Sequence, residues 1–152
     1  MYIQVRGADY SACDLGNINN HGAQTISLSR KNGLMSTGYL NRHGTIYYNP
    51  NDGSVEYSTS EFIPYKSGDI NATYLADQAY SVITIYFYDS NKNPLGYIED
   101  IIPYRKNNNN PIGTNYNFEI PESAIKSVSE NVKFIRVCSN KKNTVSTLTM
   151  NF

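Results

Sequence analysis

Short runs of β-branched and aromatic residues alternate along the chain with clusters of Asn, Gly, Pro and Asp, and this alternation limits the fold most strongly. The clearest run is residues 80–88 (YSVITIYFY), which is too rich in β-branched residues for a helix. Turn-forming clusters, such as residues 51–53 (NDG) and 66–69 (KSGD), separate runs of this kind. Strand-length segments at intervals of about 8 to 12 residues predict an antiparallel β-sandwich or barrel.

In two C-terminal segments, apolar and polar residues alternate, as expected of a strand whose two faces have different surroundings. Residues 132–138 alternate imperfectly, as expected of a strand that is covered in part on both faces, and residues 143–152 place Leu148 and Met150 on one face. One short helical turn is expected near residues 121–125, because proline suits the first turn of a helix. The other expected strands are residues 24–30, 38–40, 45–48, 61–65, 69–74, 96–104 and 116–120.

The length and charge of the chain exclude several classes of protein. With 152 residues, the chain suits one domain, which we expect at residues 22–152; residues 1–21 lack periodicity and are expected to be a linker or an extra edge strand. The net charge is zero and no basic block occurs, so we expect no nucleic-acid partner. We expect no membrane insertion, because no apolar run reaches about 18 residues.

The sequence offers little for catalysis. The two histidines, His21 and His43, have no nucleophile motif around them, and neither a G-x-S-x-G nor an H-E-x-x-H motif occurs. The carboxylates are scattered, and a glycosidase would need two of them across one cleft. We therefore expect a protein that is not an enzyme.

Metal binding and disulfide formation stay open at this point. Residues 89–93 (DSNKN) space oxygen ligands like the start of a calcium loop, but Pro94 stands where such a loop needs glycine, which favours a simple hairpin turn. A structural calcium ion elsewhere in the sandwich stays an alternative, with its ligands unknown, and we expect no other cofactor. Cys13 and Cys138 either form one disulfide or remain free thiols.

The most informative compositional feature is the excess of tyrosine and asparagine, with 14 Tyr and 20 Asn. An aromatic ring can stack on the C–H face of a sugar, and planar amide, guanidinium and carboxylate groups can bind its hydroxyls. Tyr47 and Tyr48 are adjacent, so they face opposite sides of a strand and at least one is expected to be exposed. Other tyrosine, arginine and histidine residues fall in or beside expected loops. The candidate ligand-binding residues are Arg42, His43, Tyr47, Tyr48, Tyr104 and Arg105.

Several ordered stretches resemble a known type of module. The stretches are residues 58–69 (STSEFIPYKSGD), 85–96 (IYFYDSNKNPLG), 116–124 (YNFEIPESA) and 132–137 (VKFIRV), preceded by 36–39 (STGY) and 43–47 (HGTIY). Their order resembles the galactose-binding-like jelly-roll domains of bacteriophage tail, tail-fibre and baseplate proteins and of bacterial surface proteins. The resemblance covers about residues 22–152 and implies an all-β antiparallel sandwich of the jelly-roll type, with at most one short helical turn. It also implies carbohydrate or surface binding without catalysis.

These observations favour one function and leave two alternatives. We expect a carbohydrate-binding or adhesion module of a phage tail or cell-surface protein, which recognises a cell-surface glycan through Tyr platforms and Asn, Arg and Asp hydrogen bonds. Such a module would act on the virion tail or the cell surface, beside other virion or surface-protein domains, and the resemblance suggests a homotrimer. The first alternative is a structural spacer or assembly domain without a glycan ligand. The second is the accessory binding domain of a polysaccharide-degrading enzyme.

Overall fold

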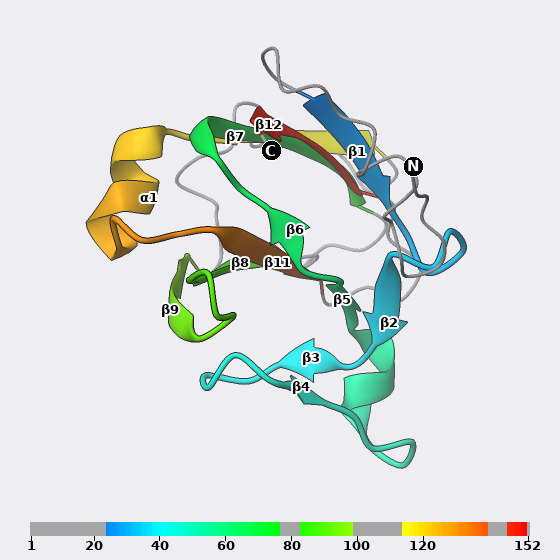
Figure 1. The fold of residues 1–152 in the computed structure, drawn as a ribbon. Helices are drawn as coiled ribbons and strands as arrows, with labels where there is room; N and C mark the ends of the chain where they lie inside the picture. The colour runs from blue at the N-terminus through cyan, green and yellow to red at the C-terminus, as the bar shows by residue number, and fades with distance from the viewer. Residues whose placement is uncertain (1–23, 77–82, 99–113, 140–145, 152) are drawn as a thin grey trace, which may run out of the picture.

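The computed structural model describes residues 24–76, 83–98, 114–139 and 146–151, which form two antiparallel sheets packed face to face (Figure 1). The first sheet has the order β1 (Gln24–Leu28), β12 (Ser146–Asn151), β7 (Ser67–Ala76), β10 (Thr114–Ile120). The second has the order β2 (Met35–Thr37), β5 (Ser58–Ser60), β11 (Phe134–Ser139), β8 (Ile83–Tyr88), β9 (Pro94–Ile98), and β6 (Ile63–Pro64) also pairs with β11. A separate hairpin joins β3 (Tyr39–Leu40) to β4 (Ile46–Tyr47). The predicted all-β antiparallel sandwich is confirmed.

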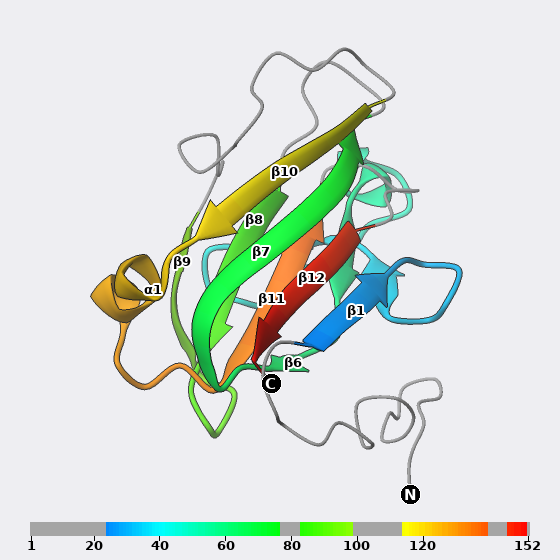
Figure 2. The same cartoon turned by 90° about the horizontal axis from the view of Figure 1, so that it is seen from above.

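The main core lies between the two sheets. Figure 2 looks onto the first sheet, with the second sheet behind it. In β12, Leu148 and Met150 are buried while Thr147 and Thr149 are partly exposed, which confirms the alternation predicted for this segment. In β8, Ile85 and its alternate neighbours Ile83 and Phe87 point into the same core. Burial of each such side chain stabilises the fold by about 1.5–3 kcal/mol.

The second sheet is buried on its outer face as well. Tyr86 and Tyr88 of β8 and Cys138 of β11 belong to a second cluster together with Leu40 of the β3–β4 hairpin. This explains why the alternation in β11 is imperfect: both faces of the strand pack against apolar groups. The outer cluster is rich in aromatic rings. Its partly buried members are Tyr39, Tyr57, Phe62, Tyr97 and Phe134.

Two tyrosine hydroxyls attach the hairpin to this outer face. The hydroxyl of Tyr86 donates a hydrogen bond to the carbonyl of Leu40 (3.0 Å), and that of Tyr88 donates one to the carbonyl of Gly44 (2.8 Å). The tyrosines are buried, so each hydroxyl needs a partner inside the protein. The hairpin therefore forms a third layer, below the second sheet in Figure 1.

The helical content exceeds the prediction of at most one short helical turn. Helix α1 (Glu122–Val128) has seven residues, and a 3-10 helix, η2 (Gly53–Glu56), was not expected. The backbone N–H of Glu122 donates to the carboxylate of Asp69 (2.8 Å), and Ile125 is the buried residue of the helix. Because Asp69 is distant in sequence, no local pattern shows that it supports the first turn.

Strand β5 was also missed, because its sequence is Ser58-Thr59-Ser60 and yet all three residues are buried. Their hydroxyls are satisfied inside the protein. The Thr59 hydroxyl donates to the carbonyl of Gly38 (2.8 Å), and the Ser60 hydroxyl accepts the N–H of Val137 (2.8 Å). A polar strand can be buried when its side chains complete the hydrogen bonding of its neighbours.

Three further predictions concern the two cysteines, the turn at residues 89–93 and membrane insertion. Cys138 is a free, buried thiol, while Cys13, His21 and the proposed linker at residues 1–21 lie outside the described residues. The turn at residues 89–93 is a hairpin turn, as predicted, in which the Asp89 carboxylate accepts the N–H groups of Asn91 (2.8 Å) and Asn93 (2.9 Å). Within the described ranges, no helix has the length and apolar character that a membrane span requires.

Two isoleucines on strands test this division between core and surface. Ile85 is fully buried in β8, whereas Ile46 in β4 keeps 37% of its surface exposed. We expect Ile85→Ala to lower the free energy of unfolding by about 2–5 kcal/mol, because it leaves a cavity between the sheets. Ile46→Ala is the matched control and should cost less than about 1 kcal/mol. Urea unfolding of both variants checks the difference, and equal losses would contradict this assignment of the core.

Candidate functional site

The β4 strand carries the most exposed apolar surface of the described part of the chain. Its residues Ile46 and Tyr47, with Tyr48 directly after it, are the exposed large hydrophobic side chains found there, at 37%, 38% and 51% exposure. Short strands at the edge of a fold normally carry polar side chains on the solvent side. Three consecutive exposed hydrophobic residues therefore mark the hairpin as the first candidate for a binding surface.

Tyr47 is the outer member of a row of three tyrosine rings. Tyr39 pairs with Tyr47 across the hairpin, and the centroids of the two rings are 5.3 Å apart with an angle of 51° between their planes. On its other side, Tyr39 lies 5.3 Å from the ring of Tyr57, at 55°. The row thus runs from the half-buried Tyr57 to the exposed Tyr47. Tilted ring pairs at such distances are favourable arrangements that hold each ring in place.

Asp52 fixes the exposed end of this row. The hydroxyl of Tyr47 donates to one carboxylate oxygen of Asp52 (2.7 Å), and the other carboxylate oxygen accepts the N–H of Ser54 (2.8 Å) at the start of η2. Hydrogen bonds from Ser54 and Tyr47 lower the pKa of the Asp52 carboxyl. The same contact with Asp52 raises the pKa of the Tyr47 phenol, because the neighbouring carboxylate holds its proton.

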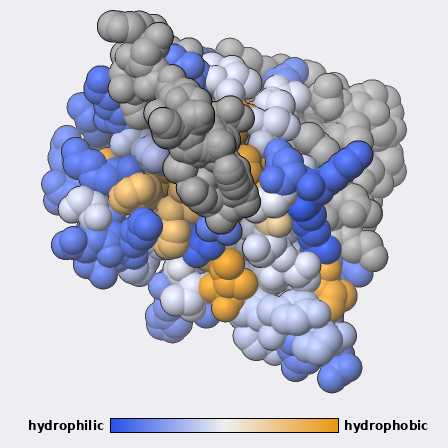
Figure 3. Space-filling view, turned by 45° about the vertical axis from the view of Figure 1, so that its right-hand side comes forward, coloured by the Kyte–Doolittle hydropathy of each residue, from blue (hydrophilic) through white to orange (hydrophobic). Residues whose placement is uncertain are grey.

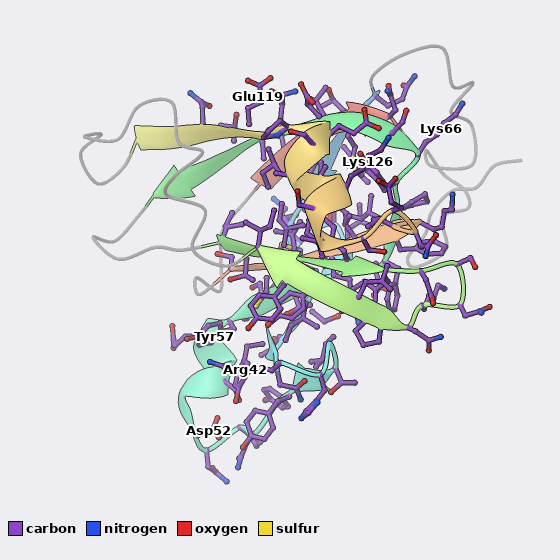
Figure 4. All side chains as sticks on the ribbon, turned by 90° about the vertical axis from the view of Figure 1, so that its left-hand side faces the viewer. Arg42, Asp52, Tyr57, Lys66, Glu119 and Lys126 are labelled. Carbon is purple, nitrogen blue, oxygen red and sulfur yellow. The ribbon has the colours of Figure 1, made fainter. Side chains whose placement is uncertain are left out.

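The loop between β4 and η2 is ordered by its own hydrogen bonds. The N–H of Asn49 donates to the Ser54 hydroxyl (2.8 Å), which in turn donates to the Asn49 carbonyl (3.1 Å). The side-chain oxygen of Asn49 accepts the N–H of Asn51 (2.9 Å). Asp52 is therefore held in position by the loop even before a ligand arrives. Figure 4 shows Asp52 and Tyr57 on the hairpin side of the molecule, opposite Glu119 and Lys126.

Arg30 supports η2 and the residues that directly follow it. Its guanidinium donates to the carbonyls of Val55 (3.1 Å) and Tyr57 (2.7 Å) and to the hydroxyl of Ser58 (2.8 Å). Burial lowers the pKa of Arg30, while the nearby Glu56 and Tyr48 raise it. Because its guanidinium makes three hydrogen bonds to the protein, Arg30 positions Tyr57 and is not available to bind a ligand.

Arg42 and His43 lie in the turn at the tip of the same hairpin. The side-chain oxygen of Asn41 accepts the backbone N–H groups of His43 (2.9 Å) and Thr45 (3.2 Å), which closes the turn. Both Arg42 and His43 are exposed, and within the described ranges neither side chain makes a hydrogen bond or ion pair. The tip packs beside Pro94, whereas Tyr47 lies at the opposite end of β4 beside Asp52.

The structure thus brings together only some of the predicted site residues. Tyr47 and Tyr48 are adjacent and exposed, and Arg42 and His43 are exposed in the turn of the same hairpin. The predicted Tyr104 and Arg105 lie outside the described residues.

Sequence reasoning missed the other members of the tyrosine row and its polar partner. These are Tyr39, Tyr57 and Asp52. The NDG sequence at residues 51–53 does predict a turn that contains Asp52. The pairing of Tyr39 with Tyr47 could have been inferred from two tyrosines flanking a turn centred on His43-Gly44. No local signal adds Tyr57 to the row, because Tyr57 reaches it through η2.

The described residues contain no group of three or more His, Cys, Asp or Glu side chains that could hold a metal ion. In the 89–93 turn, the carboxylate of Asp89 is occupied by backbone N–H groups of that turn. Comparison of the sequence with protein-family models and with curated proteins finds no match.

The docking of the hairpin tip can be tested at Gly44. Gly44 has a φ of 76°, and a Cβ built there would lie 2.8 Å from the Cβ of Pro94. Gly33 has a similar φ of 83° but nothing within 4 Å of its added Cβ, so it is a matched control. We expect Gly33→Ala to cost about 1–2 kcal/mol from backbone strain alone. Gly44→Ala should cost about 1–3 kcal/mol more, since it also forces the tip away from Pro94.

Urea unfolding measures these costs, and amide exchange at residues 41–45 shows whether the tip has moved. In Gly44→Ala the N–H groups of Asn41 and Gly44, which close the turn, should exchange faster than in Gly33→Ala. Equal stability and equal exchange in the two variants would show that the tip does not depend on this contact.

Proposed function

We propose that this domain is a non-catalytic carbohydrate-binding module, and that Tyr47 is the ring on which a sugar stacks. The observation that supports this most directly is the row of tyrosines that ends in an exposed ring hydrogen-bonded to a carboxylate. A sugar offers an apolar C–H face to the ring and hydroxyl groups to Asp52. Both kinds of partner are available at one place on the surface.

The geometry of the row suits this role. Tyr39 packs against the ring of Tyr47, and the hydroxyl of Tyr47 is bound to Asp52, so the exposed ring has lost most of its freedom before binding. A tyrosine has only two side-chain torsions, and a ring that is already fixed loses little further entropy when a ligand stacks on it. Ile46 and Tyr48 extend the apolar surface next to it.

The chemistry of the surface favours a glycan over a large protein partner. On the face drawn in Figure 3, hydrophobic areas are small and separated by hydrophilic residues. A protein interface normally needs a larger continuous patch. A single short row of rings suits a few sugar units, for which binding is weak and repeated copies supply avidity. The structural spacer, which would need a protein interface, is therefore the second candidate function.

The wider setting is part of the same proposal. The resemblance of the sequence to galactose-binding-like domains suggests a jelly-roll connection of the strands, and a place in a phage tail or on a cell surface. There the domain would bind surface polysaccharide beside other virion or surface-protein domains, in a homotrimer in the tail case. An accessory domain of a polysaccharide-degrading enzyme would use the same binding surface, so that alternative concerns the parent protein and not the site.

A glycan array that includes bacterial surface polysaccharides tests the proposal. We expect the wild-type protein to bind at least one glycan saturably, and Tyr47→Ala to weaken that binding at least about tenfold, as loss of a stacked ring removes roughly 1.5 kcal/mol or more. Tyr47→Phe keeps the ring and should retain most of the binding. Lys126→Ala, on the exposed side of α1 away from the hairpin, is the surface control.

Two further outcomes decide between the alternatives. Repeating the array with a chelator shows whether binding depends on calcium. A folded wild-type protein that binds no glycan, and that forms a stable oligomer, would contradict the proposal and support the structural spacer. Binding that survives Tyr47→Ala unchanged would place the site elsewhere on the domain.

A further inference from the structure

The position of Asp52 carries a further inference about the class of sugar, which rests on the proposed function of the Tyr47 surface. The carboxylate lies at the exposed end of the tyrosine row, within 2.7 Å of the Tyr47 hydroxyl. A ligand stacked on the Tyr47 ring would therefore have this carboxylate at its edge. The groups at that edge of the ligand must be compatible with a negative charge.

The carboxylate retains capacity for a ligand. An ionised carboxylate has about four lone-pair positions, and at Asp52 the Tyr47 hydroxyl and the Ser54 N–H use two of them, while the Ser54 side chain also interacts with the carboxylate. The remaining positions accept hydrogen bonds and cannot donate them. Sugar hydroxyls are donors, so a hydroxyl of an uncharged sugar matches the free capacity of Asp52.

The charge of Asp52 is not compensated nearby. Among the described residues, no Lys, Arg or His side chain forms an ion pair with Asp52, and the ion pair that occurs there, Lys126 with Glu122, lies on α1. Hydrogen bonds from Ser54 and Tyr47 also lower the pKa of the Asp52 carboxyl, which keeps it ionised at neutral pH. Arg42 and His43, which could bind an acidic sugar, lie in the turn at the tip of the hairpin, where the next residue, Gly44, lies beside Pro94.

We propose that Asp52 is a specificity-determining residue, which selects uncharged, hydroxyl-rich sugars and rejects sugars that carry carboxylate or phosphate groups. Two like charges about 4 Å apart repel even in water, and this repulsion corresponds to roughly fivefold in affinity at full solvation and to more where water is excluded. The sugar would donate hydroxyl protons to Asp52 while its C–H face rests on Tyr47. No covalent step is involved.

The experiment compares each acidic bacterial polysaccharide with its carboxyl-reduced form, in which every uronic acid has become the corresponding neutral hexose. The linkages and ring shapes stay the same, so the pair differs only at C6, where a charged carboxylate has become a neutral hydroxymethyl group. Neutral polysaccharides complete the set of probes. We expect the wild-type protein to bind neutral or carboxyl-reduced probes and to bind each acidic parent at least about fivefold more weakly.

Asp52→Asn is the decisive variant. Asparagine is as good an N-cap residue as aspartate, so the amide oxygen still accepts the N–H of Ser54 and η2 is preserved. The charge is gone, and we expect the preference for the reduced form to fall to within about twofold. Tyr47→Phe is the control that keeps the charge and removes only the hydroxyl, and it should keep the preference. A thermal melt of each variant confirms that it is folded.

The outcomes separate this inference from the proposed function. If the wild-type protein binds acidic parents as well as or better than their reduced forms, or if Asp52→Asn leaves the preference unchanged, the role of Asp52 is wrong while glycan binding stands. If folded wild-type protein binds none of the probes, the proposed function fails, and the role of Asp52 fails with it.

Discussion

The arrangement of the candidate site depends on the way two buried tyrosines of β8 hold a hairpin against the outer face of a sheet. Tyr86 and Tyr88 donate their hydroxyl protons to carbonyls of Leu40 and Gly44, so the hairpin satisfies polar groups that its own presence buries. Without the hairpin, both rings would face water; without the hydroxyls, two carbonyls would lose their partners. The exposed Tyr47 ring belongs to a layer that exists only because this exchange is favourable.

The same packing of the hairpin on the outer face accounts for part of the tyrosine excess of the chain. A sheet covered on both faces needs apolar surface on both, and the outer face here is built mainly from tyrosine and phenylalanine, not from aliphatic residues. Tyrosine is suited to a layer that is thin and close to solvent, because its ring packs while its hydroxyl reaches a carbonyl or water. Part of the tyrosine excess of the chain thus lies in a second, aromatic cluster.

The limits of sequence reasoning follow from the same layers. The alternation in residues 143–152 predicts a strand, since a half-buried strand records its environment in every second residue. The run at 80–88 predicts one by its β-branched and aromatic residues instead, because β8 is buried on both faces. Strand β5 could not be predicted, because its serines and threonine are buried by hydrogen bonds and not by hydrophobicity. The tyrosine row was missed because Tyr57 joins Tyr39 through a turn and a 3-10 helix, a contact without a local pattern.

Asp52 links the stability of the hairpin to its recognition chemistry. Its contact with Ser54 caps η2, which places Tyr57 behind Tyr39, and its contact with Tyr47 orients the outermost ring. Because the folded domain already holds this carboxylate, the Asp52 side chain loses little further conformational freedom when a sugar hydroxyl replaces water on its remaining lone pairs. A residue that folding places so firmly can discriminate by charge at little entropic cost, which is the physical reason to seek the specificity of this surface at Asp52 before the exposed Arg42 and His43 at the tip.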